Sequence, residues 1–188
     1  ANTWGPMWWG HAVSSDLLHW EQKVHPLHPA KMGSMFSGSA VVDQNNTAGF
    51  GENAIILFYT AANRDDSEAS YTQCMAYSLD NGVSWEKYAN NPVVKTMVGE
   101  DRDPRVVWHT KTQQWIMALY LTEDKFCLLR SSDAKSWEKF QDIQLTSDCE
   151  CPDFFSLSDN NGNEKWIFSG ANGTSTVGSF DGELFTEE

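Results

Sequence analysis

Two carboxylates in distant parts of the chain stand in settings that suit acid–base chemistry. Asp103 lies between Arg102 and Arg105, and Glu150 lies between two thiols, close to Phe154-Phe155. Neighbouring guanidinium groups favour an ionised Asp103, whereas apolar surroundings would desolvate Glu150 and keep it protonated. Hydrolysis of a glycosidic bond needs one carboxyl that donates a proton and one that stays ionised. The two residues are therefore candidates for this chemistry.

A third stretch, Phe36-Ser37, adds an aromatic ring and a hydroxyl at a comparable place in the sequence. Each of the three stretches comes at the start of an apolar run. Taken alone, the arginine-rich stretch would equally suit a surface turn with ion pairs to Glu100 and Asp101, and the stretch around Glu150 is more often a plain turn. Their shared position in a repeat favours one common site.

The repeat consists of a Ser-x-Asp turn followed by Trp-Glu. It occurs at Ser14 to Glu21, Ser78 to Glu86 and Ser131 to Glu138. The spacing of these copies is somewhat longer than that of common propeller repeats but of the same kind. The chain is therefore expected to contain blades of a β-propeller.

Apolar runs between the repeats predict four strands in each blade. No stretch of ten or more residues has the period of a helix, so the fold class is all-β, with four-stranded antiparallel blades. The expected strands are 36–42, 54–60, 71–78 and 85–88, then 105–109, 115–121, 126–131 and 137–140, then 153–157, 165–169, 174–180 and 181–185. Because the first strand of each blade lines the channel of a propeller, the three stretches should ring one pocket.

Composition narrows the class of ligand. The chain has 188 residues, 13 Lys and Arg against 26 Asp and Glu, a net charge of -13 and nine Trp. An acidic surface repels nucleic acid and anionic membranes, no apolar run is long enough to span a bilayer, and an excess of indoles suits stacking on sugar rings. Four Cys lack the spacing of a zinc site, although the pair Cys149 and Cys151 could in principle hold a metal. We expect buried free thiols, no metal and no cofactor.

At these residues the chain resembles glycoside hydrolase family 32, the invertases, inulinases, levanases and other β-fructosidases. The resemblance runs through nearly the whole chain and rests on four motifs: Trp9-Gly10-His11-Ala12-Val13-Ser14 with Asp16-Leu17-Leu18-His19-Trp20, Phe36-Ser37-Gly38-Ser39-Ala40-Val41-Val42, Arg102-Asp103-Pro104 and Glu150-Cys151-Pro152-Asp153. It implies a five-bladed propeller followed by a β-sandwich. It also implies retaining hydrolysis of terminal β-D-fructofuranosyl linkages in sucrose or fructans.

The resemblance also implies a role for each residue. Asp103 would stabilise the transition state by holding fructose hydroxyls, and Glu150 would act as general acid and then as base. The side chains implied to line the subsite for the terminal fructose are Trp4, Phe36, Ser37 and Arg102.

The sequence departs from the family at the nucleophile. The family's nucleophilic Asp belongs to a Trp-Met-Asn-Asp-Pro-Asn-Gly motif upstream of the Trp-Gly segment, and the 188 residues do not contain that motif. We expect residues 1–188 to be a partial catalytic domain, with the tail of a first blade, about three further blades and no sandwich. Such a chain would be inactive by itself.

Two alternatives remain open: a non-catalytic fructose- or fructan-binding propeller, and a related five-bladed glycosidase acting on arabinan or xylan. The sequons Asn45-Asn46-Thr47 and Asn172-Gly173-Thr174 and the polysaccharide type of substrate weakly favour a secreted or periplasmic protein. Linkage preference, hydrolysis against fructosyl transfer, and oligomeric state are left undetermined.

Overall fold

The structure is a computed structural model that describes residues 5–63 and 70–188. All regular elements in these two ranges are β-strands, which confirms the all-β prediction. Within the same ranges there is consequently no helix of the length and apolar composition that a membrane crossing requires.

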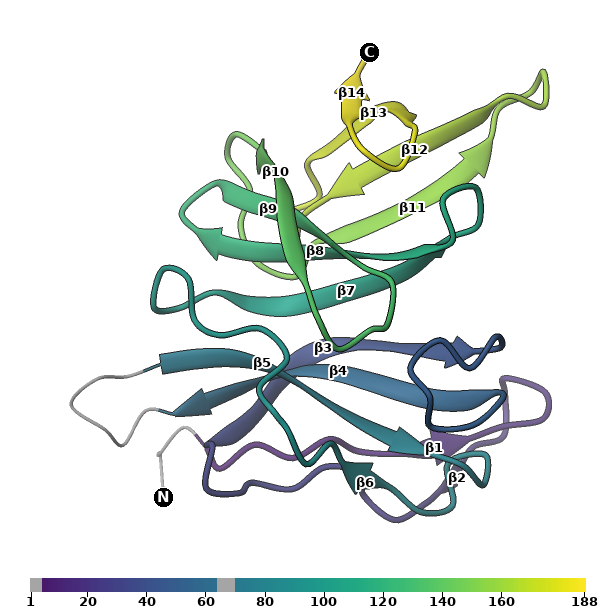
Figure 1. Cartoon of the computed structure of the whole chain (residues 1–188), viewed down its shortest axis with the longest axis vertical. Coiled ribbons are helices and arrows are strands. Elements are labelled where there is room, and N and C mark those ends of the chain that lie inside the picture. The colour runs from purple at the N-terminus through teal and green to yellow at the C-terminus, as the bar shows by residue number, and fades with distance from the viewer. Residues whose placement is uncertain (1–4, 64–69) are drawn as a thin grey trace.

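Twelve of the strands form three four-stranded sheets that follow one another from the bottom to the top of Figure 1. The first contains β3 (Ser34–Asp43), β4 (Ala54–Asn63), β5 (Ser70–Ser78) and β6 (Glu86–Lys87). The second contains β7 (Arg102–His109), β8 (Gln114–Thr122), β9 (Lys125–Ser131) and β10 (Glu138–Gln144). The third contains β11 (Asp153–Ser158), β12 (Glu164–Ser169), β13 (Ser175–Phe180) and β14 (Phe185–Glu187).

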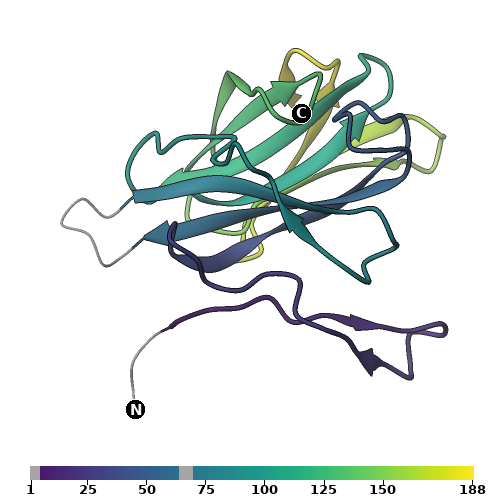
Figure 2. The same cartoon turned by 60° about the horizontal axis from the view of Figure 1, so that its bottom comes forward.

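Every sheet is an antiparallel meander in which neighbouring strands follow one another in the chain. The predicted order of four strands per unit is therefore confirmed. A short hairpin of β1 (Ala12–Val13) and β2 (Glu21–Gln22) precedes the first sheet, and Figure 2 shows this N-terminal segment running along the side of that sheet.

The cores lie between consecutive sheets. Strand β8 shows the reason, because its alternating side chains point to opposite faces. Met117 and Leu119 face the first sheet and join a core with Phe58, whereas Ile116 joins a core with Phe154 of the third sheet. A sheet that is covered on both faces reads as a nearly continuous apolar run, as β8 does. A smaller core joins the N-terminal segment to the outer face of the first sheet.

The three Ser-x-Asp turns share one geometry, which confirms the predicted repeat. In each, the Ser hydroxyl donates to the Asp carboxylate, at 3.0 Å in the first copy, 2.8 Å in the second and 2.9 Å in the third. The indole of the following Trp donates to a backbone carbonyl three residues earlier, at 3.2, 3.1 and 3.0 Å. The second and third turns connect the third strand of a sheet to the fourth, at the end of the sheet far from the candidate stretches: Ser78 pairs with Ile55, and Ser131 with Trp115.

The first strands of the first two sheets each contain a β-bulge. The register of β3 against β4 shifts between Met35 and Gly38, and that of β7 against β8 shifts between Arg102 and Arg105. Strand β7 was expected to begin at Arg105, but it begins at Arg102, so Arg102 and Asp103 lie inside the strand. A bulge redirects the side chains beside it. Strands β3 and β7 each contain one at a corresponding position, near the start of the strand.

Candidate active site

One pocket with a volume of about 470 Å³ opens at the end where β3 and β7 begin. All three candidate stretches reach it, as the shared position in the repeat predicted. The residues that line it are Met7, Trp8, Trp9, Met35, Phe36, Ser37, Tyr71, Glu100, Arg102, Asp103, Glu150 and Cys151. The remaining predicted residue, Trp4, lies outside the described residues.

The first two sheets are joined directly behind the bulge of β7. Ser39 of β3 donates its hydroxyl to the carbonyl of Pro104 and accepts the N–H of Val106, both at 2.9 Å. Asp103 itself has no strand partner in the register and adopts a left-handed backbone with φ 65°. The conformation places its carboxylate in the pocket instead of along the sheet.

The loop that carries Glu150 is held by a buried carboxylate. Asp148 is 2% exposed and accepts the backbone N–H groups of Cys149, Asn172 and Thr174 at 2.7, 2.8 and 2.7 Å. Burial by itself would raise the pKa of Asp148, but these N–H donors together lower it. Glu150 then follows with φ 54°, a left-handed conformation that turns the chain toward the pocket.

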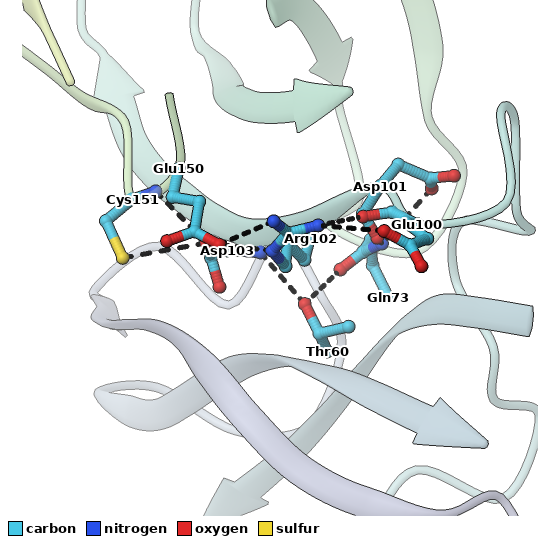
Figure 3. A network of polar contacts seen from close by, with 8 residues as sticks. All are labelled: Thr60, Gln73, Glu100, Asp101, Arg102, Asp103, Glu150 and Cys151. Atoms are coloured by element: carbon cyan, nitrogen blue, oxygen red, sulfur yellow. Dashed lines mark hydrogen bonds and ion pairs between the residues drawn. The ribbon is translucent and has the colours of Figure 1, made fainter. Parts of the chain in front are cut away.

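A single guanidinium group connects the two candidate carboxylates (Figure 3). Arg102 Nη2 lies 2.5 Å from Glu150 Oε1, and its Nε lies 3.9 Å from Asp103 Oδ2. Nη1 donates to the carbonyl of Glu100 at 2.7 Å, and the group lies 4.5 Å from the ring centroid of Tyr120. Burial alone would lower the pKa of Arg102, but the bond to Glu150 and the two negative charges raise it. Arg102 is thus a fixed positive charge in the pocket.

Asp103 is the buried carboxylate of the pair, with 6% of its surface exposed. Its Oδ2 accepts the backbone N–H of Cys151 at 3.0 Å and the thiol at 3.6 Å. Burial and the charge of Asp103 raise the pKa of Cys151 to about 11, so this thiol stays protonated and can donate. Burial also raises the pKa of Asp103, although the Cys151 N–H and Arg102 oppose the shift.

The expected surroundings of the two acids are confirmed for Arg102, which lies beside Asp103, but are wrong for Arg105 and for Glu150. Arg105, expected to help ionise Asp103, pairs with Asp153 at 2.7 Å. Glu150 was expected to be desolvated beside Phe154, but 47% of its side chain is exposed, and Phe154 is fully buried in the core between the second and third sheets. Which acid is buried depends on the bulge and on the loop, and neighbours in the sequence do not reveal it.

Besides the acids, the pocket is lined by aromatic side chains that the sequence identified only in part. Phe36 and Tyr71 meet edge to face with ring centroids 5.5 Å apart, and Trp9 donates its indole N–H to the carbonyl of Phe36 at 2.8 Å. Tyr71 and Trp8 were not predicted. The only sequence signal for Tyr71 is an aromatic residue at the start of a strand, and that for Trp8 is an aromatic residue beside a Trp-Gly motif. Aromatic faces opposite polar groups suit a sugar ring.

The thiols and acids form no recognisable metal centre in the described ranges. The four Cys are free; Cys74 and Cys127 are buried as expected, whereas the expectation is wrong for Cys149, which is half-buried, and Cys151, which is exposed. No group of three or more His, Cys, Asp or Glu side chains in the described ranges is placed to share an ion. The pocket chemistry is that of carboxylates, one guanidinium, hydroxyls and aromatic rings.

The arrangement of the sheets and the position of the pocket define a β-propeller. Strands β3 and β7 are joined through Ser39, and β7 and β11 through the pair of Arg105 and Asp153, so the first strands adjoin around the pocket axis. Comparison with known proteins gives the family: the model of the glycosyl hydrolases family 32 N-terminal domain matches residues 1–183. The chain belongs to this family.

Named relatives agree with this assignment. A levanase of Bacillus subtilis is 40% identical over 206 residues, covering 98% of this chain and 30% of the levanase. An extracellular exo-inulinase of Aspergillus awamori is 34% identical over 228 residues, covering 98% of this chain and 42% of that protein. The solved structure of the fructofuranosidase from Schwanniomyces occidentalis complexed with fructose superposes with a TM-score of 0.86 at 34% identity, covering 100% of this chain and 41% of that one. The chain thus spans less than half the length of these relatives.

Proposed function

We propose that the protein containing this chain hydrolyses terminal β-D-fructofuranosyl linkages in sucrose or fructans with retention of configuration. The observation that carries the proposal is the bridge from Arg102 to Asp103 and Glu150, in one pocket with the aromatic pair of Phe36 and Tyr71. The family assignment supports fructosides over arabinan or xylan, because the named relatives are levanases, inulinases and fructofuranosidases.

In this proposal the two acids take different roles that follow from their different exposure. Glu150 lines the pocket with 47% of its side chain exposed, and access to water suits a group that first protonates the leaving oxygen and then activates water. Asp103 is held by Cys151 and placed to accept hydroxyls of the fructose and to face the positive charge of the transition state. Arg102, Phe36 and Ser37 position the terminal ring.

Retention requires a nucleophile that bonds to the anomeric carbon as the leaving alcohol departs, and water later breaks that bond. We propose that this nucleophile and the rest of a five-bladed propeller lie outside the 188 residues. By this proposal, purified chain 1–188 releases no fructose from sucrose, inulin or levan. Fructose release by that material, abolished by Glu150→Gln, would contradict the proposal.

The decisive experiment uses the whole protein that contains these residues. Fructose release is measured from sucrose, inulin and levan, with arabinan and xylan in parallel, and the first product anomer is followed by NMR. We expect release from at least one fructoside, with the β anomer formed first, and none from arabinan or xylan. Calorimetric binding of fructose without turnover would instead support a binding module, and activity on arabinan alone would exclude fructosides as the substrate class.

We also propose that the protein acts outside the cytoplasm. The relatives that are named extracellular exo-inulinases support this location. Fractionation of the native cells, with the protein detected by antibody, is expected to find it in the medium or the periplasm. A protein confined to the cytoplasm would contradict the proposal.

A further inference from the structure

A buried chain of hydrogen bonds connects the first sheet to Asp103, and none of its members lines the pocket except Asp103 itself (Figure 3). Thr60 of β4 and Gln73 of β5 are cross-strand partners. The hydroxyl of Thr60 donates to Gln73 Oε1 at 2.7 Å, and Gln73 Nε2 donates to the carbonyl and to Oδ2 of Asp101, at 2.8 and 3.3 Å. The backbone N–H of Asp103 completes the chain by donating to Thr60 Oγ1 at 2.9 Å.

The direction of every bond in this chain is determined. A backbone carbonyl only accepts, so the carbonyl of Asp101 selects the amino end of the Gln73 amide. The amide oxygen must then face Thr60 and take its hydroxyl proton. The lone pairs of the Thr60 hydroxyl therefore accept the backbone N–H of Asp103. Thr60, Gln73 and Asp101 are each 0% exposed, so water cannot substitute for any partner.

The far end of the chain is also held. Asp101 Oδ1 accepts the hydroxyl of Thr96 at 3.1 Å and the backbone N–H groups of Met97 and Val98 at 2.9 and 3.0 Å. Asp101 therefore fixes the loop that leads into β7 as well as the orientation of Gln73. The two residues that follow it are Arg102 and Asp103.

The backbone of Asp103 needs such support. Its φ of 65° is a conformation that costs a residue other than glycine about 1–3 kcal/mol and persists only where the surroundings enforce it. The bulge leaves Asp103 outside the register with β8, so Thr60 provides a partner from the neighbouring sheet. We infer that Thr60 and Gln73 are positioning residues, which aim the Asp103 carboxylate and the Arg102 guanidinium into the pocket. This inference rests on the proposed function.

Removal of the Thr60 hydroxyl should act on turnover more than on binding. Thr60→Val keeps the branched shape but leaves the Asp103 N–H and Gln73 Oε1 buried without partners. Misplacement of a catalytic group by about 1 Å can cost about a hundredfold in rate. Because the role proposed for Asp103 is exerted in the transition state, we expect kcat to fall about 10- to 100-fold while KM changes less than about threefold.

The test compares three variants of the whole protein. Thr60→Val removes the hydroxyl, and Thr60→Ser restores it. Ser131→Ala is the matched control, because Ser131 is also a buried strand hydroxyl, 4% exposed, but belongs to a Ser-x-Asp turn at the other end of the sheets. We expect the loss of kcat in Thr60→Val alone, with Thr60→Ser within about threefold of wild type. Gln73→Met should reproduce the effect, and it replaces Thr60→Val if that variant does not fold.

Hydrogen exchange, measured by mass spectrometry on peptides covering residues 100–105, gives a readout that does not depend on activity. Thr60→Val should speed exchange there at least about tenfold, and Ser131→Ala should not. Unchanged kcat in Thr60→Val, or equal losses in Thr60→Ser or Ser131→Ala, would overturn the inference. Wild-type protein without fructose release would contradict the proposed function instead, and unchanged exchange in Thr60→Val would then reject the positioning role as well.

Discussion

Asp103→Asn is expected to separate activity from stability in the whole protein. Asparagine has nearly the same volume, tolerates the left-handed backbone that Asp103 adopts, and can still accept the N–H of Cys151 through its amide oxygen. The substitution thus removes the negative charge and little else. We expect it to lower kcat and to raise the unfolding free energy.

The catalytic loss follows from the burial of the carboxylate. With 6% of Asp103 exposed, a positive charge forming about 4 Å away would be stabilised by about 4 kcal/mol at an effective dielectric constant of about 20. That energy corresponds to about a thousandfold in kcat. The assay is initial-rate fructose release from saturating sucrose or inulin.

The gain in stability follows from the raised pKa of Asp103, which burial causes. Ionisation costs more in the folded protein than in the unfolded chain, so the cost is present above the folded pKa and disappears as the pH falls toward about 4. Asp103→Asn should therefore raise the unfolding free energy by about 0.5–2 kcal/mol at pH 7 and by less near pH 4. Urea unfolding at both pH values measures this.

Asp142→Asn is the control for Asp103→Asn. Asp142→Asn alters an exposed carboxylate on the outer strand β10 and should change neither kcat nor stability appreciably. A kcat loss below tenfold in Asp103→Asn would refute the proposed stabilisation of the transition state by the Asp103 charge. A lower unfolding free energy at pH 7, or a difference that grows toward pH 4, would refute the electrostatic part.

Three further predictions concern the loop and the strands that hold the pocket. Glu150→Gln should lower kcat at least about a thousandfold on unactivated fructosides but much less on an aryl fructoside, whose leaving group needs little protonation, and an equal loss on both would argue against an acid role. Asp148→Ala should lower the unfolding free energy by about 3 kcal/mol at pH 7, measured by urea unfolding. Because the pKa of Asp148 is lowered in the fold, the difference from wild type should shrink below about pH 4. Gly38→Ala should lower the unfolding free energy by about 3 kcal/mol or more, because a Cβ there would lie 1.9 Å from the carbonyl oxygen of Phe58. Gly10→Ala is the control: Gly10 has open space around it, so this variant should unfold at the wild-type temperature in calorimetry.

Much of the fold could be predicted from local patterns. A nearly continuous apolar run marks strands such as β8, and the Ser-x-Asp turns with their Trp mark the connection from the third to the fourth strand of a unit. Both signals arise from interactions between residues close in the chain, so they are visible without a tertiary structure. The repeat also placed Phe36, Arg102 and Glu150 in equivalent positions, which is why they could be assigned to one pocket.

The properties of the two acids could not be predicted in the same way. Residues adjacent in the sequence suggested a charged neighbourhood for Asp103 and an apolar one for Glu150. Arg102 does lie beside Asp103, but Asp103 is the buried acid, and Glu150 is half-exposed and paired with Arg102. Burial depends on which way a bulge turns a side chain and on what other elements cover it. Those covering groups come from distant segments, and their contribution has no local signal.

The sequence by itself thus determined the all-β class, the repeated units and the meeting of Phe36, Arg102 and Glu150 at one pocket, because periodicity and repeated turns are local properties. The tertiary structure alone decided that Asp103 is buried, that Glu150 is open to solvent and that Thr60 and Gln73 stand behind them. Electrostatics and backbone strain at a site depend on the atoms packed around it, and here those atoms come from another sheet.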